Sequence, residues 1–224
     1  MPNWCYQDLL VIGPESEIQR LHNEMRITED GKEFMSLNHF FPCPQELVDT
    51  PSAWYADPDE QARQAALEDA MSMKHGFKNW YDWCVANWGT KWGACSVDVN
   101  MNVGRDADIA SLTGHFESAW APATGLLERV SALFPTLVFG ISFTEESSAF
   151  AGYTVWRGGT VVSDVDWEPK CPERNENEDE DSYEERFMDW QSEEQGRCQS
   201  MMTSVVTGQV AGGMSSTRAP IHLA

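Results

Sequence analysis

Six segments of the chain have the pattern of hydrophobic and polar positions that is typical of β-strands. Apolar and polar side chains alternate in most of them, and the fourth is apolar almost throughout. Gly158 and Gly159 separate the last two, which is a hairpin signal. Residues 33–41 are also expected to be extended. The six segments are residues 4–12, 94–103, 112–120, 137–143, 149–157 and 160–167.

Helices are predicted between these strands, because apolar side chains recur there three and four residues apart. The first covers residues 14–25, and the last begins at Pro122. Asp57 and Pro58 form a helix start, with an N-cap carboxylate followed by a proline in the first turn. A shorter helix follows over residues 77–88.

The order of these elements predicts an α+β fold. It contains the β-α-β-β-α-β pattern of ferredoxin-like domains, followed by an extra C-terminal hairpin. We therefore expect an antiparallel sheet with helices packed mainly on one face over residues 1–167. Residues 168–200 are expected to form an acidic extension that is partly helical and packed on the domain. Residues 201–224 are rich in Gly, Ser, Thr and Met and are expected to form a flexible tail.

Residues 79–94 (NWYDWCVANWGTKWGA) contain four of the ten tryptophans. On a helical projection Trp80, Trp83 and Trp88 fall on one side, which favours burial in the core. Gly89 then fits the C-cap of the helix. The alternative is a surface formed by Trp88, Lys91 and Trp92, on which the bases of a single-stranded nucleic acid would stack.

Charge is the strongest bulk signal, with 36 acidic and 15 basic residues and a net charge of -21. Direct binding to nucleic acid phosphates or to anionic membranes needs clustered Lys and Arg, so this charge disfavours both. It favours a partner protein with a basic surface. Twelve acidic and only four basic residues lie between positions 168 and 198. The candidate partner-binding residues are Glu176, Glu178, Asp179, Glu180, Asp181, Glu184 and Glu185.

Motifs for catalysis, cofactors or metals do not stand out. GxxxxGK[ST], GxGxxG, HExxH and GxSxG are all missing from the sequence, so no cofactor is expected. The six cysteines include no CxxC pair, which argues against a structural zinc site. His115 and Glu117 lie two residues apart and would share one side of a strand, so they are the candidate base and orienting residue of an enzyme.

Membrane insertion is not expected, because no apolar run approaches the roughly 20 residues that span a bilayer. The first ten residues, MPNWCYQDLL, lack the basic and apolar regions of a secretory signal. We therefore expect a cytoplasmic protein.

Three segments together resemble one family: MPNWCYQDLLVIGP, GFKNWYDWCVANWGTKWGA and FESAWAPATGLLERVSALFP. They are similar to the YubB-type ferredoxin-like proteins of phages, plasmids and related mobile elements, over residues 1–167. The resemblance implies the ferredoxin-like fold and a mobile-element origin, and it implies no catalytic residues. The acidic segment after Trp167 lies outside it.

Three functional hypotheses follow. The first is a non-enzymatic phage or plasmid protein in the host cytoplasm that inhibits a host defence or nucleic-acid-binding protein through a DNA-mimicking acidic surface. The second is single-stranded nucleic acid binding through the sheet face and the Trp88–Trp92 turn. The third is an enzyme that uses His115 and Glu117.

Overall fold

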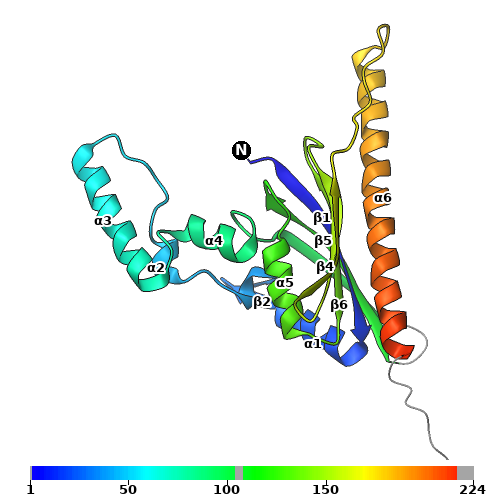
Figure 1. Ribbon diagram of the computed structural model, residues 1–224, viewed down its shortest axis with the longest axis horizontal. Helices are drawn as coiled ribbons and strands as arrows, with labels where there is room; N and C mark the ends of the chain where they lie inside the picture. Colours follow the sequence, from blue (N-terminus) through cyan, green and yellow to red (C-terminus); the bar gives the residue numbers. More distant parts are fainter. Residues whose placement is uncertain (1, 104–107, 216–224) are drawn as a thin grey trace, which may run out of the picture.

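The computed structural model describes residues 2–103 and 108–215 of the chain. Six strands form one antiparallel sheet in the order β4-β5-β1-β6-β7-β8 (Figure 1). The α+β class and the antiparallel sheet predicted from the sequence are confirmed. The strands are β1 (Trp4–Pro14), β4 (Cys95–Val103), β5 (Ile109–Ala119), β6 (Val138–Glu145), β7 (Ala151–Arg157) and β8 (Thr160–Trp167).

The first four of these strands follow the predicted β-α-β-β-α-β order. Helix α1 (Glu15–Met25) connects β1 to the part of the chain that leads to β4, and α5 (Thr124–Leu133) connects β5 to β6. Strand β1 lies between β5 and β6 and is antiparallel to both. Gly158 and Gly159, with φ of 57° and 76°, form the predicted turn between β7 and β8.

Between α1 and β4 the chain forms a hairpin and three helices. These are β2 (Arg26–Glu29), β3 (Lys32–Met35), α2 (Gln45–Val48), α3 (Pro58–His75) and α4 (Trp80–Trp88). The prediction that residues 33–41 are extended is correct only as far as Met35, because residues Asn38–Phe40 form a short 3-10 helix, η1. The Asn38 side chain holds the chain there, since it bonds to the carbonyls of Trp92 and Ala94 at 3.1 Å each.

The predicted helix caps are present in the structure. The Asp57 carboxylate accepts hydrogen bonds from the backbone N–H groups of Asp59 and Glu60 at 3.0 Å each, which fixes the start of α3. Asn79 caps α4 in the same way. Gly89 ends α4 with φ of 81°, a conformation that glycine adopts without a steric penalty.

One face of the sheet carries the main core, which α1, α4 and α5 cover. Trp83 and Trp88 are each 8% exposed and belong to this core, as predicted. Trp80 is only half-buried and packs against its edge. The tryptophan-rich segment is therefore mainly a stability element.

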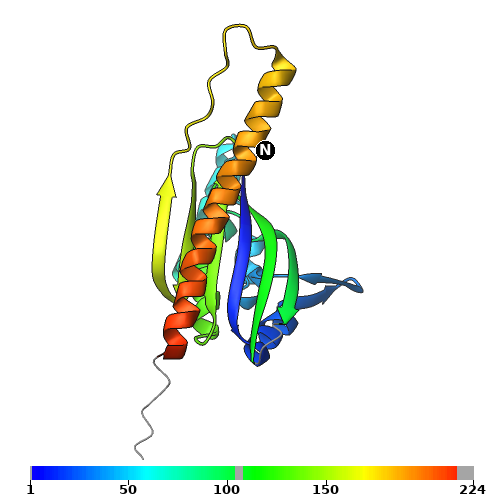
Figure 2. The ribbon, with the colours of Figure 1, turned by 90° about the vertical axis from the view of Figure 1, so that its right-hand side faces the viewer.

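The opposite face of the sheet is crossed by one long helix, α6 (Glu180–Ser215) (Figure 2). Its Cys198, Met202 and Val206 recur every fourth residue and are buried, the last two in a second core with Val138, Tyr153 and Val155. Gly140 allows the close approach of the helix. A Cβ at that position would lie 2.6 Å from the Met202 sulfur and 2.7 Å from a Val206 methyl carbon.

The prediction of a flexible tail from residue 201 is therefore wrong for residues 201–215, which continue α6. Their Gly, Ser and Thr content is typical of flexible segments. Here the helix is nevertheless stabilised, because Met202 and Val206 lie one turn apart and both side chains are buried against the sheet. Residues 216–224 lie outside the described part of the chain.

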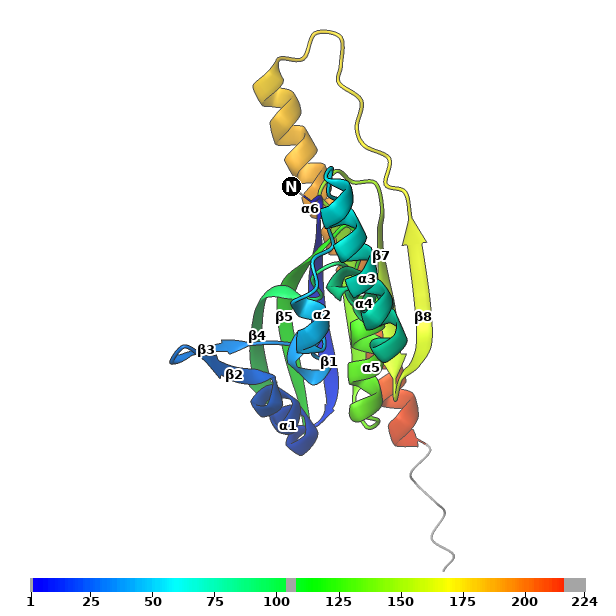
Figure 3. The ribbon, with the colours of Figure 1, turned by 90° about the vertical axis from the view of Figure 1, so that its left-hand side faces the viewer.

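The N-terminal part of α6 projects past the end of the sheet, near the start of β1 (Figures 1 and 3). The chain that follows β8 runs along this projecting part before it turns into the helix. None of the helices in residues 2–103 and 108–215 has the length and apolar character required to cross a membrane.

Candidate functional site

The acidic arm, defined here as residues 168–194, consists of the loop after β8 and the first part of α6, most of which projects beyond the sheet. Three aromatic rings on one side of the helix face this loop. The Tyr183 and Phe187 ring centroids are 6.1 Å apart, and those of Phe187 and Trp190 are 5.5 Å apart. The Tyr183 hydroxyl donates a hydrogen bond to the Pro172 carbonyl at 3.3 Å. The loop and the helix are therefore joined along one side.

An ion pair fastens the turn between loop and helix. Arg186 donates from Nε to one Glu178 carboxylate oxygen at 2.9 Å and from Nη2 to the other at 2.7 Å. This two-pronged geometry is the strongest form of an arginine–carboxylate pair. The Asp179 carboxylate accepts the backbone N–H of Ser182 at 2.8 Å and so caps α6.

This clamp should respond to acid. The hydrogen bonds from Arg186 lower the pKa of Glu178 from its ordinary 4.5 to about 2. Because the folded pKa is the lower one, the clamp stabilises the arm above about pH 4.5 and loses this contribution as the pH falls toward 2. We expect an NMR titration of the Glu178 side chain to have its midpoint well below 4. Glu178→Gln should loosen the loop at neutral pH and abolish this pH dependence. A midpoint near 4.5 would show that the clamp does not form in solution.

The seven acidic residues predicted from the sequence divide into two groups. Glu178, Asp179 and Glu180 maintain the local structure, the last through an ion pair with Arg174 at 2.8 Å. The other four are exposed, and within the described part of the chain none of them forms an ion pair. These four are Glu176, Asp181, Glu184 and Glu185.

Two further exposed carboxylates extend this surface and were missed by the sequence analysis. Asp189 and Glu193 follow Asp181 and Glu185 at intervals of four residues along α6, and all four are exposed. We call these four residues the carboxylate stripe. Since an α-helix rises 1.5 Å per residue, the stripe places a carboxylate about every 6 Å over about 18 Å. The four-residue spacing was visible in the sequence and would have predicted the stripe if the helix had been extended beyond Glu185.

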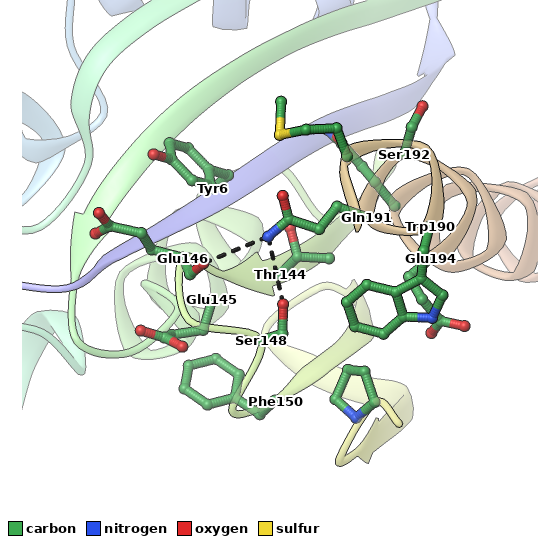
Figure 4. A pocket seen from close by; sticks show the side chains of 13 residues that line it. Tyr6, Thr144, Glu145, Glu146, Ser148, Phe150, Trp190, Gln191, Ser192 and Glu194 are labelled. Carbon is green, nitrogen blue, oxygen red and sulfur yellow. Dashed lines mark hydrogen bonds between the residues drawn. The ribbon is translucent and has the colours of Figure 1, made fainter. Parts of the chain in front are cut away.

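A cavity of about 230 Å³ lies where the arm meets the sheet (Figure 4). The Gln191 side chain reaches across it and donates a hydrogen bond to the Ser148 hydroxyl at 3.4 Å. Nearby, the Trp167 indole N–H donates to the Glu194 carboxylate at 3.1 Å. These contacts tie the middle of α6 to the β6–β7 turn and to β8, and so they orient the arm.

The second predicted surface, formed by Trp88, Lys91 and Trp92, is only partly present in the structure. Trp88 is 8% exposed, and its indole N–H donates to the Phe41 carbonyl at 2.9 Å, so its ring is not available for stacking. Lys91 and Trp92 do lie at the surface. Trp120 joins them from the end of β5 and is 46% exposed.

The Lys91 ammonium lies over three indole rings. Its nitrogen is 4.6 Å from the Trp92 centroid, 5.0 Å from that of Trp120 and 5.7 Å from that of Trp80. The ring of Trp4, at the start of β1, is 5.9 Å from that of Trp92. We call these five residues the tryptophan–lysine cluster. Trp4, Trp80 and Trp120 are far apart in the sequence, so their proximity could not be predicted from it.

His115 and Glu117 lie on β5, on the face of the sheet that α6 crosses. His115 is exposed and stands in register with Asp8 on one neighbouring strand and Asp98 on the other. Across residues 2–103 and 108–215, no hydrogen bond or ion pair connects His115 to Glu117. The base and orienting residue of the third hypothesis are therefore not coupled.

Several other polar or titratable side chains are explained by the fold. The Asp164 carboxylate accepts the Thr154 hydroxyl at 2.7 Å. His75 and Lys74 both contact Glu46, at 2.8 Å and 2.5 Å. Burial raises the pKa of the Cys198 thiol to about 11, so this thiol stays protonated at neutral pH. No three His, Cys, Asp or Glu side chains of the described residues are grouped so that they could hold a metal ion.

Comparison with known proteins supports a ferredoxin-like family. Residues 98–185 match the model of a family described as the ferredoxin-like domain in Api92-like protein. Among solved structures, the chain resembles the protein Api92 from Yersinia pseudotuberculosis, with 10% sequence identity and a TM-score of 0.43. The similarity covers 76% of this chain and 99% of that chain. None of the curated proteins matches the chain. The family match extends to Glu185, so it includes the acidic residues from Glu176 onward that the resemblance over residues 1–167 leaves out.

Proposed function

We propose that this chain is a non-enzymatic binding protein whose acidic arm occupies the basic surface of another protein. The carboxylate stripe along the first part of α6 carries the proposal. All four side chains are exposed. Such a surface complements clustered Arg and Lys, and the net charge of -21 adds long-range attraction toward them.

The partner that fits this surface is a nucleic-acid-binding protein. Each strand of duplex DNA presents one phosphate per 3.4 Å or so of helix axis, whereas the stripe presents one carboxylate per 6 Å or so. The arm therefore resembles a strand of lower charge density. Its association should be fast and should weaken steeply with salt, as for exposed charge pairs in general.

Met188 adds an apolar contact to this surface. It is 64% exposed and lies directly before Asp189 of the stripe. Apolar anchors within a charged rim are typical of protein–protein interfaces, and a large flexible methionine adapts to different surfaces. This feature favours a protein partner for the arm over a simple polycation.

A mobile-element origin and an anti-defence role complete the proposal. They are supported by the resemblance of the GFKNWYDWCVANWGTKWGA segment and its two companions to phage and plasmid proteins. A phage or plasmid protein that fills the nucleic-acid groove of a host defence nuclease would act in the host cytoplasm. It would need no catalytic residues of its own.

The test neutralises the stripe and leaves the shape of the side chains unchanged. We expect a variant carrying Asp181→Asn, Glu185→Gln, Asp189→Asn and Glu193→Gln to lose about 2 kcal/mol of binding free energy, roughly 30-fold in affinity, because each exposed pair contributes about 0.5 kcal/mol. The measurement is capture of DNA-binding proteins from a bacterial lysate on the immobilised chain, with elution by duplex DNA, followed by titration of the captured protein.

The control removes the same charge elsewhere. Four exposed acidic residues, Glu29, Glu60, Asp69 and Glu128, make no side-chain ion pair or hydrogen bond to another described residue. Their joint neutralisation changes the net charge equally and should leave the affinity almost unchanged at physiological salt. Equal losses in the two variants would mean that only net charge matters. Capture that duplex DNA does not reverse would exclude DNA mimicry.

A further inference from the structure

The tryptophan–lysine cluster has no role in the acidic arm, and it combines exposed indole rings with a cation. It lies where β1 begins, β5 ends and the α4–β4 turn returns to the sheet. Trp92 and Trp120 are 36% and 46% exposed, so each offers part of an indole ring to solvent. Tryptophan is enriched at binding interfaces, and grouped exposed aromatic rings mark a candidate binding surface.

The backbone under these rings is held rigidly. The buried Thr90 hydroxyl donates to the Ala119 carbonyl at 2.5 Å, which joins the turn before Lys91 to the residue before Trp120. Asn38 accepts the Ala94 N–H at 2.9 Å and donates to the Trp92 carbonyl at 3.1 Å. A site whose groups are fixed before the ligand arrives loses less entropy on binding.

Trp120 adopts an unfavourable backbone conformation in this cluster. Its φ is 67°, in the left-handed region that a bulky side chain rarely occupies. Its N–H donates to the Asn3 carbonyl at 2.9 Å, which holds the residue in place. A glycine would adopt this conformation without strain. Strained residues cluster at binding sites, so this conformation supports a binding role for the Trp120 ring.

The positive charge of Lys91 favours an anionic ligand. Within residues 2–103 and 108–215, no carboxylate lies within 4.0 Å of its ammonium group, although the chain is strongly acidic. A cation at the centre of the rings repels a second cation and attracts an anion. The indole faces add affinity for a flat ring. A ligand that combines a flat ring with an anion satisfies both features.

We propose that the tryptophan–lysine cluster binds a nucleotide, with the base stacked on Trp120 or Trp92 and the phosphate paired with Lys91. The net charge of -21 opposes a long polyanion, so the site takes one nucleotide unit, either as a free nucleotide or as part of a short single strand. This proposal is independent of the acidic arm, and it replaces the buried Trp88 of the sequence prediction with Trp120.

The test uses the full chain with adenosine monophosphate, adenosine and a short oligodeoxythymidylate, followed by calorimetry and quenching of tryptophan fluorescence. We expect adenosine monophosphate or the oligonucleotide to bind, and adenosine to bind less tightly. Trp120→Gly and Lys91→Met should each weaken binding about tenfold or more, as expected when one stacked ring or one phosphate contact is lost. Tighter binding of the oligonucleotide than of the mononucleotide would identify a single strand as the source, and the reverse a free nucleotide.

Two controls keep the result decisive. Trp120→Gly removes the ring but relieves the backbone strain, so its thermal stability should stay close to that of the parent and a loss of binding would not reflect unfolding. Trp54→Ala removes a 78% exposed tryptophan outside the cluster and should leave binding unchanged. Undetectable binding of all three probes to the parent, or an equal loss in Trp54→Ala and Trp120→Gly, would overturn the proposal.

Salt dependence gives an independent readout. A single phosphate contact to Lys91 predicts that the logarithm of the affinity for the oligonucleotide falls with the logarithm of salt concentration with a slope of about -0.7. Lys91→Met should reduce this slope to near zero. A slope several times larger, or one that Lys91→Met does not change, would mean that the phosphates bind elsewhere.

Discussion

Replacing Trp83 with alanine should lower the free energy of unfolding by about 3–5 kcal/mol, as truncation of a buried large aromatic side chain does. The ring is 8% exposed and meets that of Trp88 edge to face at 5.3 Å between centroids. The surrounding structure relaxes only partly into the space that it leaves. Denaturant unfolding followed by far-UV circular dichroism measures the loss without depending on tryptophan fluorescence.

The same measurement on two other tryptophans tests the cause. Trp80 is half-buried at the edge of the core, so Trp80→Ala should cost less than Trp83→Ala. Trp54 is 78% exposed, and its replacement should change stability by no more than about 0.5 kcal/mol. Equal losses for Trp83 and Trp80 would contradict the burial pattern. A negligible loss for Trp83 would refute the assignment of this helix to the core.

The elements that the sequence predicted correctly are those set by local chemistry. The alternation in residues 94–103 and the Gly158-Gly159 turn depend on neighbours a few residues apart, and β4 and the β7–β8 hairpin occur where these signals place them. Asp57 and Gly89 specify helix ends for the same reason, because a cap bonds to backbone groups within its own helix turn.

The features that the sequence did not reveal depend on contacts between distant residues. The second face of the sheet is covered because Gly140 in β6 leaves space for Met202 and Val206, which lie more than sixty residues later. A glycine in an apolar strand does not by itself indicate which helix approaches it. The Gly, Ser and Thr residues around Met202 therefore predict flexibility when the contact of Met202 with β6 and β7 is not known.

The candidate sites differ in the same way. The acidic composition of the arm was enough to predict its exposed carboxylates up to Glu185. The extension of the stripe to Asp189 and Glu193 could be recognised only once the course of α6 was known. Only part of the tryptophan–lysine cluster could be predicted from the sequence. Lys91 and Trp92 are adjacent in the sequence, but Trp120 reaches them through the Thr90–Ala119 hydrogen bond, which connects turns from separate parts of the fold.

The second large effect concerns the attachment of α6. Met202→Asp should destabilise the protein by about 3–5 kcal/mol, because it places a carboxylate without a partner in a site that is 1% exposed and lined by Val138, Tyr153 and Val155. Native-state hydrogen exchange measures where the loss occurs. Amides of α6 should exchange faster, together with those of β6 and β7, which the helix covers.

Met188→Asp is the matched control for Met202→Asp, since it introduces the same carboxylate on the same helix at a residue that is 64% exposed. It should change stability by no more than about 0.5 kcal/mol. Because Met202 lies on the sheet and the carboxylate stripe lies nearer the start of α6, Met202→Asp should also release the arm from its fixed direction without removing any of its charge. Partner binding that survives in Met202→Asp but not in the neutralised stripe would mean that the arm needs its carboxylates and not its orientation. Loss of binding in both would mean that the sheet contributes to function by holding the arm in place.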